Sequence, residues 1–311
     1  MSILQISEKE SKKSTFIMDF LLAGISASIG KTATAPLERI KLILQNQISI
    51  EAIERPYIGI NDCFIRLTRS EGFLSLWRGN LPNVLRYFPN QAMNFSIKDS
   101  LKEIICPYDP NKHFWKYALG SCLSGGLAGS ISLTLCHPID LVRTRLATDN
   151  KNREGQRNFK GTIDCFKKIT QAEGVLGLYR GFVVSVLGIF AFRAVYFGGY
   201  DSLKSKLKNK KSSFILKWIV AQSVTIWSSM MFYPLDTIRR RIMIESGKVE
   251  ADKKYKNAMD CLKKMYRQES IRGFYKGFFT NAIKISGSSI VLVLYDEFQK
   301  IFGLEARGGS K

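Results

Sequence analysis

The sequence predicts an all-α membrane protein, with six transmembrane helices in three tandem repeats of about 100 residues each. Three observations support this prediction. One motif recurs three times at regular spacing, long apolar segments alternate with basic ones, and the 311 residues carry a net charge of +21. A chain that is 45% hydrophobic is too apolar for intrinsic disorder. The basic excess predicts an anionic partner: nucleic acid, anionic lipid or an anionic small molecule.

The repeat is marked by Pro36, Pro138 and Pro234, which lie 102 and 96 residues apart. Two other features recur with the same spacings: an aspartate followed by a cysteine, and an aromatic residue followed by a base and a glycine. Such shared register indicates three copies of one unit. The expected organisation is an N-terminal tail at 1–15, repeats at 16–108, 109–209 and 210–302, and a C-terminal tail at 303–311.

Each repeat contains two apolar segments, which are joined by a polar basic stretch and a short amphipathic piece. Residues 117–139 and 218–235 contain no Asp, Glu, Lys or Arg, and they approach the roughly 20 residues that span a bilayer. The other four candidates, near 16–45, 80–102, 180–206 and 277–301, are interrupted by single basic residues: Lys31, Arg86, Arg193 and Lys284. A charge at membrane depth is costly and normally faces a wet cavity, so these residues predict a water-filled path for an anion.

Metal and redox chemistry are not expected. The six cysteines include no C-x-x-C pair, so neither a disulfide framework nor a structural metal site is predicted. His113 and His137 are expected to be structural. Gly30-Lys31-Thr32 resembles the end of a phosphate-binding loop, but Ile25 occupies the place of its first glycine and the segment has a helical pattern. The chain is therefore not expected to be a nucleotide-hydrolysing enzyme.

The most specific pattern is Pro-x-acid-x-x-base, which occurs at each repeat proline. Proline weakens the helix locally, and residues three apart project from one helical face. In a threefold arrangement the acid of one helix meets the base of the next. The acids and bases are Glu38 and Lys41, Asp140 and Arg143, and Asp236 and Arg239.

With these motifs the chain resembles the mitochondrial carrier family over about residues 16–302. The resemblance implies pseudo-threefold symmetry, short matrix-side helices and a location in the inner membrane of a mitochondrion or a mitochondrion-derived organelle. It also implies a matrix gate of three ion pairs: Glu38 with Arg143, Asp140 with Arg239, and Asp236 with Lys41, with Gln45 bracing one of them. A cytoplasmic gate is implied on the even-numbered helices: Asp99 with Lys204, Asp296 with Lys102, and Asp201 with Gln299, which is not charged.

Cardiolipin sites are a further implication of the resemblance, since helix N-termini favour phosphate groups. The implied residues are Gly59, Trp77, Arg78, Gly79, Gly161, Tyr179, Arg180, Gly181, Tyr275, Lys276 and Gly277. The third site departs from the pattern, because Asn257 stands for a glycine and Ser270 replaces the glycine that matches Gly72 and Gly174.

Within the family, the sequence is most similar to members that exchange ADP for ATP. Their signature of three arginines and three methionines corresponds here to Arg239, Arg240, Arg241, Ile242, Met243 and Ile244. The resemblance implies substrate binding by Lys31, Arg86, Arg193, Arg240 and Lys284 for the phosphates, and by Gly188, Ile189 and Phe192 for adenine. Three positions differ from these members: Lys284 stands for arginine, Phe192 for tyrosine and Phe232 for serine.

The implied activity is exchange of cytosolic ADP for matrix ATP by alternating access, in a functional monomer without cofactor or enzymatic step. The alternative is a carrier for another adenine nucleotide or phosphate-bearing substrate. A nucleic-acid-binding protein is disfavoured, because the basic residues occur singly inside apolar spans rather than along a polar face.

Overall fold

The computed structural model describes residues 24–25, 27–90, 93, 97, 101, 104–105, 114–152, 155–192 and 214–286, and every element in these ranges is helical. The named elements are η1 (Gln47–Ser49), α2 (Ile60–Glu71), η2 (Phe73–Trp77), α3 (Asn80–Leu85), α5 (Phe114–Ala147), α6 (Thr162–Glu173), η3 (Val175–Tyr179), α8 (Phe214–Ile244), η4 (Glu250–Asp252) and α9 (Ala258–Phe274). Residues 27–46, 182–192 and 278–286 are also helical. The prediction of an all-α fold is confirmed.

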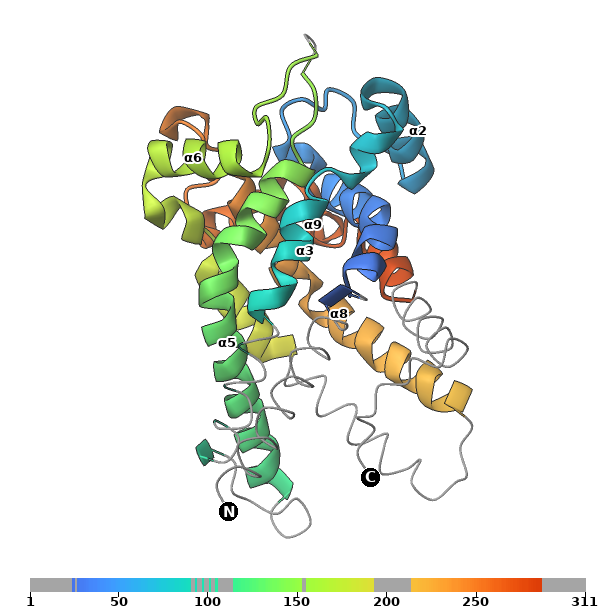
Figure 1. Cartoon of the computed structure of the whole chain (residues 1–311), viewed down its shortest axis with the longest axis vertical. Helices are drawn as coiled ribbons and strands as arrows, with labels where there is room; N and C mark the ends of the chain where they lie inside the picture. Colours follow the sequence, from blue (N-terminus) through green and yellow to red (C-terminus); the bar gives the residue numbers. More distant parts are fainter. Residues whose placement is uncertain are drawn as a thin grey trace, which may run out of the picture.

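The long helices converge at one end of the molecule and separate toward the other. Helices α5 and α8 approach each other near the short helices α2 and α6, and then diverge (Figure 1). Helix α5 continues through Pro138 and α8 through Pro234. The motif that follows each proline therefore lies at the converging end of its helix.

Each repeat has its own hydrophobic core at this converging end. In the first repeat, the end of helix 27–46 packs on α2 and η2 through Ile43, Cys63, Leu67 and Leu76, each at most 1% exposed. The corresponding cores of the second and third repeats include Leu141, Cys165, Ile169 and Leu178, and Ile238, Cys261, Met265 and Phe274. The recurring cysteines Cys63, Cys165 and Cys261 are thus buried residues of these cores.

The recurring aspartates fix the entry to the short helices. The backbone amide four residues before each aspartate donates to its carboxylate, at 3.1 Å from Ile58 to Asp62, 2.8 Å from Lys160 to Asp164 and 3.1 Å from Lys256 to Asp260. A base four residues after each aspartate forms an ion pair with it: Arg66, Lys168 and Lys264. In each repeat the aspartate therefore binds the turn before the short helix, and the cysteine that follows it packs in the buried core.

The chain makes one sharp turn per repeat after these helices, and two of the three turns use glycine. Gly72 and Gly174 have φ angles of 88° and 69°. Ser270, at the same place in the third repeat, adopts φ 56° and ψ −163°, so that α9 is bent there. This backbone region is almost restricted to glycine. The turn has therefore been retained in the third repeat without the residue that favours it.

The outer faces of the long helices are apolar. On α5 exposed leucine and isoleucine side chains recur every four residues: Leu119, Leu123, Leu127, Ile131 and Leu135. Among the described residues, one helical stretch, Val175–Phe192, is long and apolar enough to cross a membrane, with a mean hydropathy of 2.0.

Candidate functional site

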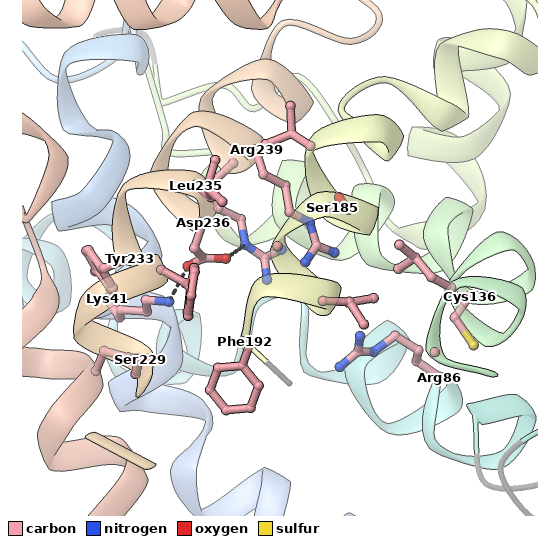
Figure 2. Close-up of a pocket in the computed structure, with 18 of the residues that line it drawn as sticks. Lys41, Arg86, Cys136, Ser185, Phe192, Ser229, Tyr233, Leu235, Asp236 and Arg239 are labelled. Carbon is pink, nitrogen blue, oxygen red and sulfur yellow. Dashed lines mark hydrogen bonds and ion pairs between the residues drawn. The ribbon is translucent and has the colours of Figure 1, made fainter. Parts of the chain in front are cut away.

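A cavity of about 630 Å³ lies between the long helices, and most of the predicted binding residues line it. In the close-up, Lys41 and Asp236 lie on one side and Arg86 and Cys136 on the other, with Phe192 also reaching the space (Figure 2). The predicted substrate and gate residues that line the cavity are Lys41, Arg86, Gly188, Ile189, Phe192, Asp236, Arg239, Arg240 and Lys284. Five of these side chains are basic and one is acidic, so the cavity is suited to an anion.

Among the described residues, one predicted phosphate-binding side chain, Lys31, does not line this cavity. Lys31 lies at the edge of this arrangement, where its Nζ donates to the Asn83 carbonyl at 3.2 Å and sits 4.7 Å from the centre of the Tyr87 ring. Because residues 27–46 are helical, the Gly30-Lys31-Thr32 segment does not form a phosphate-binding loop. Arg193 lies outside the described residues. Phe232, one of the departures noted above, lines the cavity.

Three ion pairs link the helices at the converging end, with the partners that the sequence analysis expects. Glu38 pairs with Arg143, Asp140 with Arg239, and Lys41 with Asp236 at 2.8 Å. We refer to these as the gate pairs. Gln45 Nε2 donates to Asp236 Oδ2 at 3.2 Å and to Thr237 Oγ1 at 3.0 Å, so its amide braces one pair. Each pair joins two different repeats.

Each gate acid also contacts a second cation from the cavity. Lys284 Nζ lies 3.1 Å from Glu38 Oε1, and Arg86 Nη1 lies 3.7 Å from Asp140 Oδ1. Arg240 reaches both Asp140 at 3.4 Å and Asp236 at 3.5 Å. The Asp140 side chain is fully buried, where loss of a partner is more costly than at the surface. The expected substrate-binding cations and the gate acids therefore form one network.

The three consecutive arginines of α8 have three different environments. Arg239 belongs to a gate pair, while Arg240 lines the cavity. Arg241 is fully buried and binds Glu269 with both guanidinium nitrogens, the second at 2.9 Å, while Nη1 also donates to the Tyr255 hydroxyl at 3.2 Å. This third arginine anchors α9 rather than facing the cavity. The adjoining Ile242, Met243 and Ile244 are buried.

A second set of ion pairs around the short helices was missed by the sequence reasoning. Arg39, 1% exposed, pairs with Glu71 at 2.8 Å. Arg180 pairs with Glu173 at 3.4 Å. Glu71, Glu173 and Glu269 occupy the same place in the three repeats, so their spacing of 102 and 96 residues is the signal that could have revealed this set.

The residues expected at lipid sites also make contacts within the protein. Gly79, Gly181 and Gly277 have φ angles of 83°, 82° and 79°, and a Cβ on each would lie 3.1 to 3.3 Å from a backbone oxygen of the neighbouring repeat. Those oxygens belong to the gate bases Arg143, Arg239 and Lys41. Arg78 pairs with Asp149 at 2.6 Å, and Lys276 pairs with Glu269 at 2.9 Å.

The remaining lipid-site residues lie where helices begin or near the long helices. Gly59 and Gly161 are the N-caps of α2 and α6 and provide no side-chain cap. Asn257, at the same place before α9, accepts a hydrogen bond from the Asp260 amide at 2.9 Å. Trp77 Nε1 donates to the Thr32 carbonyl at 2.8 Å, and the Tyr179 hydroxyl to the Thr134 carbonyl at 3.1 Å. Tyr275 stacks on Tyr233.

All the residues of the expected cytoplasmic gate lie outside the described residues. They are Asp99, Lys102, Asp201, Lys204, Asp296 and Gln299. His137, expected to be structural, is buried and stacks on Tyr179 with 6.0 Å between ring centres. His113 lies outside the described residues.

Three helical units surround a cavity with a mainly basic wall and are joined at one end by ion pairs between neighbouring units, an arrangement suited to a carrier for an anionic solute. A family model described as mitochondrial carrier protein matches residues 12–109, 114–211 and 210–305. The chain belongs to the mitochondrial carrier family, and its three-repeat organisation is confirmed.

Curated relatives cover nearly the whole chain. The mouse (Mus musculus) ADP/ATP translocase 4 is 45% identical over 314 residues, with 98% of each chain covered. The human (Homo sapiens) ADP/ATP translocase 4 is 46% identical over 95% of this chain and 94% of its own length. The human ADP/ATP translocase 3 is 46% identical over 92% of this chain and 98% of its own length.

Proposed function

We propose that this protein exchanges ADP for ATP across the mitochondrial inner membrane, by alternating access and without a covalent step. The observation that carries the proposal is the cavity between the long helices, whose wall is mainly basic and which lies directly against three inter-repeat ion pairs. The relatives that cover nearly the whole chain are ADP/ATP translocases, which supports these nucleotides as the substrates.

Substrate phosphates would compete with the gate acids for the same cations. Arg86, Arg240 and Lys284 each contact a gate acid. A phosphate can accept charge-assisted hydrogen bonds from these side chains and replace the carboxylates. The acids would then keep only their gate partners, so the barrier to separating the repeats falls. An empty cavity would keep the gate closed, which favours exchange over leakage.

The membrane and the transport cycle complete this proposal. Because ATP carries one more negative charge than ADP, exchange would respond to the membrane potential. We propose that cardiolipin binds between the repeats, near Gly59, Gly161 and the aromatic-base-glycine motifs, and that a single chain is the functional unit. The three gate pairs are all formed within one chain, which supports this part of the proposal.

A carrier for another phosphate-bearing substrate is the alternative, and the cavity wall gives a specific reason to retain it. Phe192 and Phe232 line the cavity. Their rings provide stacking surfaces without the hydroxyl groups that help to select a base. The phosphate-binding part of the cavity therefore supports the proposal more strongly than the base-binding part.

Exchange assays in liposomes would test the proposal. The purified carrier is reconstituted with internal ATP, and uptake of labelled ADP, ATP, AMP, GDP, phosphate and coenzyme A is compared. We expect ADP and ATP to exchange with each other at least ten times faster than the other compounds. Rapid exchange of another phosphate compound without ADP uptake would establish the alternative.

A further inference from the structure

An outer set of ion pairs joins neighbouring repeats on the surface formed by the short helices. In two junctions, the base that precedes a short helix pairs with the glutamate that ends the short helix of the preceding repeat. These pairs are Arg157 with Glu71 at 3.0 Å, and Lys253 with Glu173 at 2.9 Å. The base at this place in the first repeat is Arg55, and its counterpart Glu269 is bound instead by Arg241 and Lys276. Among the described residues, Arg55 therefore does not form the ion pair with a glutamate of another repeat that Arg157 and Lys253 form.

Arg55 instead lines a second cavity of about 500 Å³, between the first and second repeats. Arg66, Arg69 and Lys151 also line it, and we call it the basic cavity. It shares no lining residue with the cavity between the long helices. Its acidic lining residues are Glu54 and Glu71. Bases therefore outnumber acids in its wall by four to two.

Most of the positive charge in this wall is not neutralised. Glu71 is occupied by Arg39 and Arg157, and it also accepts a hydrogen bond from the Lys151 backbone amide at 2.8 Å. Within the described ranges, no acidic side chain forms an ion pair with Arg55, Arg69 or Lys151. Three cations thus face one cavity without an acidic partner in the part of the chain that the structure describes.

The wall around these cations is held in place by the protein. Arg66 pairs with Asp62 at 3.3 Å and donates to the Arg55 carbonyl at 2.9 Å. Its guanidinium carbon also lies 4.3 Å from the centre of the Tyr57 ring. These contacts fix the loop that carries Arg55 against α2. A bound anion would therefore require little ordering of this loop.

We propose that the basic cavity is a second anion-binding site, which binds a phosphate group. It is separate from the cavity between the long helices, which we call the transport cavity. Arginine is suited to phosphate because its planar fork can bind two oxygens at once. A volume of about 500 Å³ is in the range of sites for small ligands. Because Arg55 and Arg69 belong to the first repeat and Lys151 to the second, the bound phosphate bridges two repeats.

The test uses the full chain, purified in detergent, with the variant Arg86→Ala to weaken binding in the transport cavity. Isothermal titration with ATP and with inorganic pyrophosphate measures the remaining site. The test variant adds Arg55→Gln, Arg69→Gln and Lys151→Gln. A control of equal charge change adds Lys256→Gln, Lys263→Gln and Arg267→Gln, which are exposed residues of the third repeat.

We expect the Arg86→Ala protein and the control to bind pyrophosphate, and the test variant to bind it at least tenfold more weakly. The site accepts soluble nucleotides as well as pyrophosphate if ATP shows the same loss. A parallel measurement of cardiolipin retention by native mass spectrometry identifies a lipid headgroup as the source of the phosphate if only this retention falls in the test variant. Equal retention and equal pyrophosphate and ATP affinity in the test and control variants, with both folded by thermal unfolding, would overturn the proposal. Failure of nucleotide exchange in liposomes would leave the pyrophosphate result unaffected, so the two proposals are distinguishable.

Discussion

Lys284 Nζ lies 3.1 Å from Glu38 Oε1, so one cation of the cavity is also a counterion of a gate acid. Glu38 is at the same time bound to Arg143 of the next repeat. A substrate phosphate that takes Lys284 therefore removes one of the two cations that stabilise Glu38. A ligand shifts a conformational balance only through such a difference in its interactions with the two states. The contact provides that difference, because Lys284 can bind either Glu38 or a substrate phosphate.

Neutralising Lys284 is expected to remove most of the exchange activity. A hydrogen bond to a charged group contributes about 1.5 to 3 kcal/mol, which corresponds to roughly a 10- to 100-fold loss of affinity. Uptake of labelled ADP by liposomes containing Lys284→Ala measures this loss. Lys284→Arg is the control, since it retains the charge and adds a planar fork. Near-normal ADP uptake by a folded Lys284→Ala protein would exclude this residue from the substrate site.

Reversing the charges of one gate pair tests the gate. Asp236→Lys places a cation opposite Lys41, at a site where the native carboxylate and ammonium are 2.8 Å apart. The single variant is expected to lose exchange, because like charges at this distance repel. Adding Lys41→Asp restores opposite charges and is expected to recover part of the activity. Gln45 stays in both variants, so its amide can brace the restored pair.

Two controls separate this result from misfolding. Each variant is checked for insertion and for its thermal unfolding profile before transport is measured. The double variant Asp236→Lys and Arg143→Asp changes the same charges without restoring the pair, because Arg143 is bound to Glu38. If both double variants are equally inactive and folded, the pairing between Lys41 and Asp236 has no role in transport.

Much of the fold was predictable because three repeats carry the same chemical pattern. The prolines predicted where the converging ends of the helices lie, and the acids and bases after them predicted which helices meet. The recurring Asp62, Asp164 and Asp260 were visible in the sequence, but their role was not. That role is a hydrogen bond to a backbone amide, which leaves no pattern in side-chain type at the donor position.

The contacts that sequence reasoning missed depend on distances between repeats. The sequence placed Arg240 and Lys284 in a cavity, but it did not indicate that they also touch the gate acids. Likewise, Arg241 has a different environment from Arg239 and Arg240 because successive residues of a helix point about 100° apart. One arginine of the run therefore faces α9 while another faces the cavity.

The three recurring cysteines are expected to resist thiol reagents in the folded protein. Burial raises the pKa of Cys63, Cys165 and Cys261 each to about 12. The thiolate is the reactive form, and at pH 8 it would be about one part in ten thousand at such a pKa. Maleimide labelling at pH 8, followed by mass spectrometry of the peptides, is expected to detect these cysteines only after denaturation.

A matched control for the labelling is Gln171→Cys, which places a thiol on the exposed side of α6. This cysteine should react within minutes under conditions where Cys165, on the same helix, does not. The raised pKa also sets the direction of the pH effect. Since the folded state favours the neutral thiols, the stability that they contribute is present below pH 9 and is lost as the pH rises toward 12. Rapid labelling of Cys165 at pH 8 in the folded protein would contradict both the expected resistance to thiol reagents and the raised pKa from which the pH effect is derived.

Ser270→Gly is expected to stabilise the protein, because it places glycine in a backbone conformation that serine rarely adopts. The φ of 56° and ψ of −163° at Ser270 lie in a region that costs a non-glycine residue about 1 to 3 kcal/mol. Glycine loses more entropy on folding, so the net gain should be about 1 kcal/mol. For a chain of this size, that gain corresponds to a rise of about 2 °C in the apparent unfolding temperature. The temperature is measured at one scan rate, since unfolding from detergent is often irreversible.

The reverse changes, Gly72→Ser and Gly174→Ser, should lower the unfolding temperature by a similar amount. A Cβ at either glycine would meet no atom within 4 Å, so their positive φ angles alone are tested. If Ser270→Gly leaves the unfolding temperature unchanged while the two reverse variants lower it, contacts of the serine hydroxyl offset the backbone cost. If none of the three changes has an effect, the turn does not limit the stability of the carrier. A rise for Ser270→Gly with a fall for both reverse variants would show that the third repeat retains this turn at a cost in free energy that the other two repeats avoid.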